Sequence, residues 1–65
     1  MRVRLVIPQE KRALPPKLHG EHYAFHNQTG TVLCGAGKDG AWVRFDGQEP
    51  YSYVGCPVAW LEKVQ

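Results

Sequence analysis

The second half of the chain alternates short runs of β-forming residues with turns that contain glycine or proline. Residues 31–34 and 41–45 are two such runs, and the segment between them ends in Asp39-Gly40, a pair that favours tight turns. We therefore predict a hairpin with the Asp-Gly pair at positive-φ positions. Alternation with period two gives the second run a core-facing and a solvent-facing side. The core-facing side holds Ala41, Val43 and Phe45, and the solvent-facing side holds Trp42, Arg44 and Asp46.

The N-terminal third predicts a strand followed by a proline-rich loop. Residues 2–7 alternate charged and apolar side chains, which indicates a strand with Val3, Leu5 and Ile7 in the core. Residues 8–20 contain three prolines and a glycine, which exclude a long helix. We expect a loop here with one helical turn around residues 9–13. Loops of this length are often mobile or functional.

The remaining elements are predicted from the same kinds of signal. Residues 22–26 and 51–54 are expected to be strands, the second with its two tyrosines on one face. A second Asp-Gly pair, Asp46-Gly47, predicts the turn that ends the strand at 41–45. Residues 57–60 suit a short 3₁₀ turn, and residues 61–64 are expected to complete the sheet.

Length and composition limit what the chain can be. We expect one domain over residues 1–65, with a thin core, because small domains bury a small fraction of their surface. No apolar run approaches the roughly 20 residues of a membrane span, and no signal-peptide pattern opens the chain. A cytoplasmic location is therefore expected. Cys34 and Cys56 are expected to be reduced thiols.

Basic residues are concentrated near the N-terminus. The net charge is +2, but residues 1–20 contain five basic residues against one acidic residue, which gives +5 − 1 = +4. Such an excess indicates an anionic partner for this segment. These basic residues are Arg2, Arg4, Lys11, Arg12 and Lys17.

The order of these segments resembles the SH3-like barrels of the Tudor and KOW type. The matching stretches are residues 18–21, 30–33 and 43–47, together with residues 57–64 at the C-terminal end. The resemblance implies an all-β, five- to six-stranded antiparallel barrel with a short 3₁₀ turn before the last strand. The strand at residues 2–7 is additional to the minimal barrel. Tudor-like domains bind ligands through aromatic clusters.

The C-terminal Pro-Val-Ala-x-Leu-Glu segment at residues 57–62 is also similar to that of plasmid type II dihydrofolate reductases. That family consists of SH3-like barrels that assemble as tetramers around one pore. A Val-Gln-Ile-Tyr stretch lines their pore, whereas this chain has Tyr-Val-Gly-Cys at residues 53–56. The catalytic motif is not matched, so the resemblance implies the architecture and not the activity.

Exposed aromatic residues are the strongest indication of a binding site. A barrel this small cannot enclose all of its large aromatic side chains, and an exposed ring beside Arg44 can stack on an unpaired base or a cation. The candidate binding residues are Arg2, Arg4, Lys11, Arg12, Trp42, Arg44, Tyr51 and Tyr53. Trp60 is expected to cap the core.

Metal and nucleophile chemistry are not expected. His22 and His26, placed on one face of a strand, would lie about 13 Å apart, which is too far for one ion. His19 and His22 could bind one ion from a helix, but Gly20 and the predicted strand argue against a helix here. Cys34 or Cys56 would be a further ligand only if it lay close by, which the sequence does not establish. Cys34 shares a strand face with Val32 and is predicted to face the core, where cysteines are inert.

These observations favour a non-enzymatic binding module that contacts single-stranded nucleic acid or a protein partner, without a cofactor and without a membrane. One alternative is a small oligomeric enzyme or ligand-binding assembly with a shared pore. Another is a structural subunit of a larger complex. Oligomerisation is a common remedy for a thin core, so a homo-oligomer is an open expectation.

Overall fold

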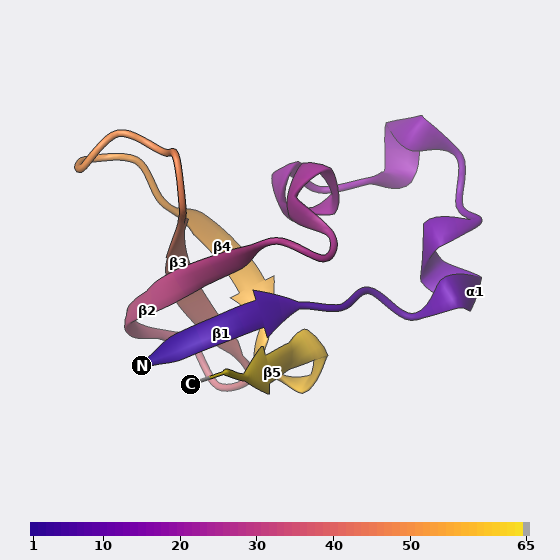
Figure 1. The fold of residues 1–65 in the computed structure, drawn as a ribbon. Coiled ribbons are helices and arrows are strands. Elements are labelled where there is room, and N and C mark those ends of the chain that lie inside the picture. The colour runs from indigo at the N-terminus through magenta and orange to yellow at the C-terminus, as the bar shows by residue number, and fades with distance from the viewer. Residues whose placement is uncertain (65) are drawn as a thin grey trace.

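The fold is built on an antiparallel sheet of five strands, and the computed structural model describes residues 1–64 (Figure 1). The strands are β1 (Arg2–Leu5), β2 (Thr29–Ala36), β3 (Gly40–Phe45), β4 (Val54–Pro57) and β5 (Leu61–Lys63). Their order across the sheet is β4-β3-β2-β1-β5. The predicted all-β class is confirmed.

The sheet is open and does not close into a barrel. β4 forms one edge and β5 the other, and the part of the chain described contains no ladder between them. β1, which the sequence predicted as an additional strand, lies inside the sheet and pairs with both β2 and β5. The structure thus shows a five-stranded sheet with a seam between its two edges.

β2 is bent by a β-bulge. It pairs with β1 at its start and with β3 along its length, and the register shifts between Val32 and Cys34. A bulge places two residues of one strand opposite one residue of its partner, which bends and twists that strand. As a consequence, Leu33 and Cys34 are both exposed, although they are consecutive in a strand.

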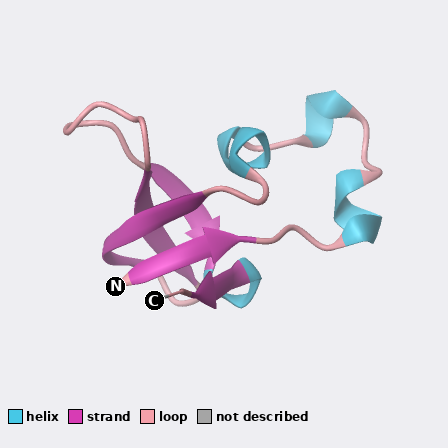
Figure 2. Cartoon of the chain, in the orientation of Figure 1, coloured by secondary structure: helices cyan, strands magenta, loops and turns pink. Residues whose placement is uncertain are grey.

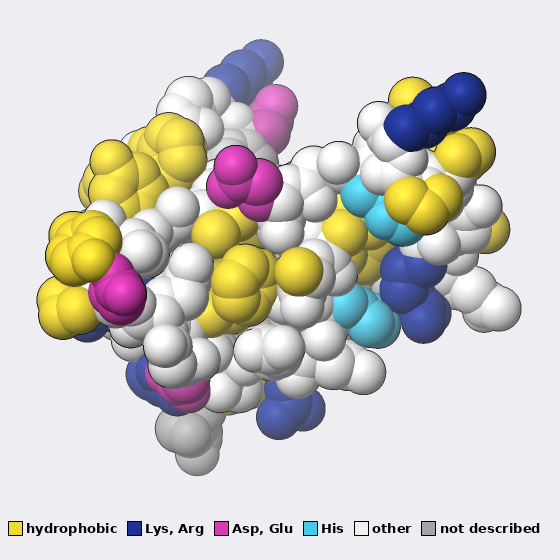
Figure 3. All heavy atoms as spheres, turned by 90° about the horizontal axis from the view of Figure 1, so that it is seen from above, with side chains coloured by type: hydrophobic (Ala, Val, Ile, Leu, Met, Phe, Trp, Pro, Cys, Tyr) yellow, Lys and Arg dark blue, Asp and Glu magenta, His cyan; other side chains and the backbone are white. Residues whose placement is uncertain are grey.

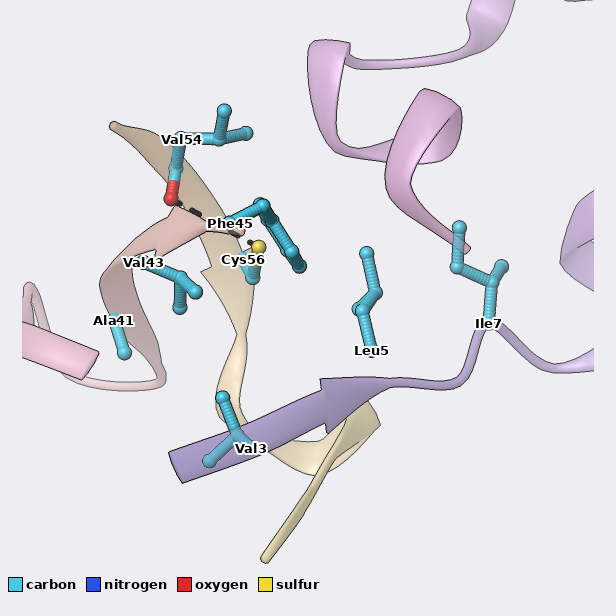
Figure 4. Packing of buried hydrophobic residues seen from close by; sticks show 8 residues of the cluster. All are labelled: Val3, Leu5, Ile7, Ala41, Val43, Phe45, Val54 and Cys56. Carbon is cyan, nitrogen blue, oxygen red and sulfur yellow. Dashed lines mark hydrogen bonds between the residues drawn. The ribbon is translucent and has the colours of Figure 1, made fainter. Parts of the chain in front are cut away.

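The core lies against one side of the sheet (Figure 4). It confirms the predicted inward faces of β1 and β3, and β4 adds two residues that the sequence did not assign. The buried residues are Val3, Leu5, Ile7, Ala41, Val43, Phe45, Val54 and Cys56. Full burial of such apolar side chains contributes roughly 1.5–3 kcal/mol each, so this cluster is the main source of stability.

The long connection between β1 and β2 contains three short helical segments (Figure 2). They are the single turn α1 (Gln9–Arg12) and two 3₁₀ helices, η1 (Pro16–Leu18) and η2 (Glu21–Phe25). The predicted helical turn around residues 9–13 is confirmed. No helix of residues 1–64 is long and apolar enough to cross a membrane.

The strand predicted at residues 22–26 is wrong, because residues 22–25 belong to η2 and His26 follows it in a turn. The edge of β1 near this segment is already occupied: the Asn27 N–H donates to the Leu5 carbonyl oxygen (2.6 Å), and the Leu5 N–H donates to the Gln28 carbonyl oxygen (3.1 Å). Because no free strand edge is available there, the segment forms a helix instead of a strand. From there Phe25 stacks on Phe45 with ring centroids 4.4 Å apart.

The turn between β2 and β3 differs in detail from the prediction. The positive φ belongs to Gly37 (73°) and not to Asp39-Gly40. Gly40 begins β3, and its lack of a side chain matters for space, because a Cβ there would lie 2.7 Å from the Ala36 carbonyl oxygen. The second Asp-Gly turn is as predicted, with Gly47 at φ 95°.

The strand predicted at residues 51–54 begins later than expected. β4 starts at Val54, and both tyrosines lie in the loop before it. The Ser52 N–H donates to the Glu49 carbonyl oxygen (2.9 Å), so a turn occupies the segment after Pro50. The 3₁₀ turn η3 (Val58–Trp60) and the final strand β5 are confirmed.

Candidate binding surface

Trp42 and Tyr53 form an exposed pair on the outer side of the sheet. Their ring centroids are 5.2 Å apart and their planes meet at 79°, an edge-to-face arrangement. Trp42 is 37% exposed and Tyr53 is 53% exposed. With Leu33 and Cys34 they line a hollow of about 350 Å³. We call these four residues the aromatic face.

Three strands position the aromatic face. Trp42 in β3 lies opposite Cys34 in β2 and Gly55 in β4. The indole lies over the Gly55 backbone, since a Cβ at this glycine would come within 3.2 Å of the Trp42 ring. The bulge in β2 brings Leu33 to the same hollow. Part of the surface of the β2–β4 region is therefore apolar and open.

The two cysteines are free and lie in different environments. Cys34 was predicted to face the core, but the bulge turns it outward and it is exposed. Cys56 is the buried cysteine: its Sγ contacts the Val54 carbonyl oxygen (3.8 Å), and burial raises the pKa of the Cys56 thiol to about 11. The expectation of two unpaired thiols is confirmed.

Arg44 lies two residues from Trp42 on the same outer side of β3. Its Nη1 donates a hydrogen bond to the Pro50 carbonyl oxygen (3.2 Å), which ties the strand to the loop before β4. Arg44 is half-buried. The structure therefore brings together one arginine and two exposed aromatic rings from the predicted set, through β3 and this loop.

The positive charge of Arg2 is largely balanced by the carboxylate of Asp46. Its guanidinium donates to both carboxylate oxygens of Asp46, at 2.7 and 2.6 Å, and also to the Thr31 hydroxyl (3.1 Å). The hydrogen bonds between Arg2 and Asp46 raise the pKa of Arg2 and, with one from the Thr29 hydroxyl, hold the pKa of Asp46 well below its usual range. Arg2 is thus a weaker phosphate ligand than its charge suggests.

The other predicted residues are dispersed. Arg4 lies opposite Glu62 in the β1–β5 ladder. Lys11 and Arg12 lie on α1, where the Arg12 Nε donates to the Ile7 carbonyl oxygen (2.9 Å). Tyr51 is 76% exposed at the far loop. The basic N-terminal segment therefore does not form one continuous patch with the aromatic face.

A second aromatic group, which the sequence did not predict, surrounds Tyr23. His19 stacks on Tyr23 with centroids 4.2 Å apart, and His22 and Trp60 lie beside it at 4.9 and 6.1 Å. The Nε2 of His19 is 2.7 Å from the Leu14 carbonyl oxygen. Burial lowers the pKa of His22. Trp60 packs against the core, as expected for a residue that caps it.

The histidines have structural partners. The Nδ1 of His26 accepts a hydrogen bond from the Ile7 N–H (3.0 Å), which fixes the chain after β1. Within residues 1–64 there is no group of three or more His, Cys, Asp or Glu residues that could hold a metal ion.

Figure 3 shows one group of exposed hydrophobic side chains at the end of the molecule away from α1 and others nearer α1, with the visible histidines toward the α1 end and basic side chains at both ends. The signal missed in the sequence was the β2 bulge, because uniform alternation placed Cys34 on the core-facing side together with Val32. No protein-family model matches the chain, and searches of curated proteins and of solved structures gave no significant match.

Proposed function

We propose that this protein is a non-enzymatic binding module and that the aromatic face, flanked by Arg44, is its ligand site. The observation that carries the proposal is the exposed right-angled pair of Trp42 and Tyr53 over a hollow of about 350 Å³. Large aromatic side chains are usually buried unless a partner covers them. Their exposure beside an anchored arginine is the arrangement expected of a recognition surface.

We also propose that the open sheet is a variant of the SH3-like architecture. Two features support this interpretation: a 3₁₀ turn precedes the last strand, and the second strand is strongly bent. The resemblance concerns architecture alone, and the ligand has to be argued from the aromatic face itself.

Single-stranded nucleic acid is the ligand class that these residues fit best. An unpaired base can stack on Trp42 or Tyr53, which is worth about 1–3 kcal/mol per base, while Arg44 contacts a phosphate. Because Arg2 is paired with Asp46, we expect only about two phosphate contacts and therefore a shallow dependence of affinity on salt.

The test is a titration of short single-stranded RNA and DNA, followed by the fluorescence of Trp42. A Trp60→Phe background removes the second tryptophan signal. We expect quenching on binding, loss of binding with Trp42→Ala, and a salt slope reduced by about one with Arg44→Gln. Lys17→Gln on the β1–β2 connection is the matched charge control and should bind normally.

A short apolar protein segment is the second candidate, favoured by Leu33, which is 44% exposed at the edge of the same hollow. The two candidates differ in their response to salt, because apolar contacts do not release counterions. If no oligonucleotide binds even at low salt, the nucleic-acid proposal is wrong and the protein segment becomes the better explanation.

A further inference from the structure

A second pocket lies beside the edge strand β5, and we call it the β5 pocket. It has a volume of about 240 Å³ and shares no residue with the aromatic face. Its lining comes from β1, β2, β3 and β5, with Met1 before β1 and Val58 of η3. The residues that matter here are Val3, Val32, Gly35, Ala41, Leu61 and Lys63.

Two small residues lie opposite each other in the part of the β2–β3 ladder that lines the pocket. Gly35 in β2 pairs with Ala41 in β3, and Ala41 is buried, so this pair is on the inner side of the sheet. A Cβ built on Gly35 would meet no atom within 4 Å. A larger residue at either position would occupy this space.

Lys63 brings a positive charge to the rim of this apolar space. It pairs with Val3 in the β1–β5 ladder, and paired residues in a ladder share a face, so Lys63 is on the core-facing side of β5. Glu62, the preceding residue, is on the opposite side with Arg4. Among the described residues, Lys63 is the one charged side chain that lines the pocket.

We propose that the β5 pocket binds a small monocarboxylate that carries a branched aliphatic or phenyl group. The apolar group lies against Val32, Ala41 and Leu61, and the carboxylate accepts hydrogen bonds from the Lys63 ammonium. The volume lies below the roughly 300–1,000 Å³ typical of pockets for drug-sized ligands, which restricts the ligand to a compact molecule.

The competing explanation is that an inward-facing lysine only protects the edge strand β5 from pairing with another chain. That explanation predicts no preference for an acid over a neutral molecule of the same shape. The experiment is therefore built on such a pair, 3-phenylpropionate and 3-phenylpropionamide, titrated into the ¹⁵N-labelled full chain and followed by amide chemical shifts.

We expect the acid to shift the amides of Gly35, Ala41 and Leu61 with a dissociation constant on the order of 1 mM. The neutral amide is expected to bind about fivefold more weakly, because it lacks the partly exposed ion pair that the carboxylate forms with the Lys63 ammonium. Equal binding of acid and amide, shifts confined to other residues, or no shifts at about 20 mM ligand would overturn the proposal.

Three variants complete the test. Lys63→Gln should remove the preference for the acid, and Gly35→Leu should abolish binding by filling the pocket. Lys38→Gln, in the β2–β3 turn, is the matched charge control. If Gly35→Leu does not fold, the effect of Lys63→Gln on the preference for the acid is by itself the test of the proposal. Trp42→Ala should leave binding of the acid unchanged, so this result is independent of the proposed function.

Discussion

Arg2 shows why a count of charges overstates what a surface offers to a ligand. The sequence assigned it to a basic segment of net charge +4, whereas the structure places both oxygens of Asp46 on its guanidinium. Arg4 likewise has Glu62 opposite it. Pairings across strands from distant parts of the sequence cannot be predicted without the register, so a count of charges could not show that these two arginines lie beside or opposite acidic residues.

The same ion pair predicts a loss of stability in acid. The pKa of Asp46 is lowered from its ordinary value of 3.8 by hydrogen bonds from Arg2 and Thr29. A carboxylate with a lowered folded pKa stabilises the fold above its unfolded pKa, and this contribution is lost as pH falls toward the folded pKa. Denaturant unfolding should thus show stability that declines below about pH 4 in the wild type and declines less in Asp46→Asn. Identical profiles would contradict the ion pair.

The two thiols should react at very different rates. Cys34 is exposed, whereas Cys56 is 2% exposed and its pKa is raised to about 11. Since the thiolate is the reactive form, a thiol reagent at neutral pH should modify one cysteine per chain quickly and the second only on unfolding. Cys34→Ser should leave no fast reaction. A fast reaction in that variant would show that Cys56 is accessible.

At the scale of elements, the sequence pattern was sufficient to predict the strands in which one face is regularly apolar. β1 and β3 were predicted with the correct buried residues, because alternation in both strands is uninterrupted. Residues 22–26 have the composition of a strand but lack a partner, since the backbone of residues 27–28 already bonds to Leu5. Whether a strand edge is free to pair depends on the tertiary structure and cannot be read from the local sequence. The bulge in β2 escaped prediction for the same reason.

Three glycines around the β2–β3 hairpin should respond differently to alanine. Gly37→Ala should destabilise by about 1 kcal/mol or more, because its φ of 73° is costly for a residue with a Cβ. Gly40→Ala should also destabilise, through the contact with the Ala36 carbonyl oxygen. Gly35→Ala is the control and should not destabilise. The melting temperatures of the three variants test this expectation. A lower melting temperature for Gly35→Ala would contradict the structure, in which a Cβ at Gly35 meets no atom within 4 Å.

At the scale of the whole molecule, the small core gives the fold a low free energy of unfolding. A chain of 65 residues is expected to have a stability of roughly 3–10 kcal/mol, at 0.05–0.15 kcal/mol per residue. Phe45→Ala removes a ring that is 1% exposed and stacked on Phe25, a change that typically costs about 3–5 kcal/mol. We expect circular dichroism to show a largely unfolded variant. Phe45→Leu should remain folded with a lower melting temperature, and a fully stable Phe45→Ala would contradict this core.

The candidate site was only partly predictable at this scale. Trp42 and Tyr53 were singled out because a small core cannot enclose every large aromatic side chain, and both are exposed. Their meeting depends on Gly55, which leaves space for the indole, and on the late start of β4. The β5 pocket could not be predicted, because its lining comes from residues far apart in the sequence that only the pairing of the strands brings together.

The position of β1 between β2 and β5 sets an order of events during synthesis. β1 leaves the ribosome first, but the strand that covers its second edge begins 61 − 5 = 56 residues after Leu5. At about 5–20 residues per second, that edge waits roughly 3–11 s for its partner. During this interval the nascent chain exposes an unpaired strand beside Val3 and Leu5, and chaperones or neighbouring nascent chains can reach it before β5 does.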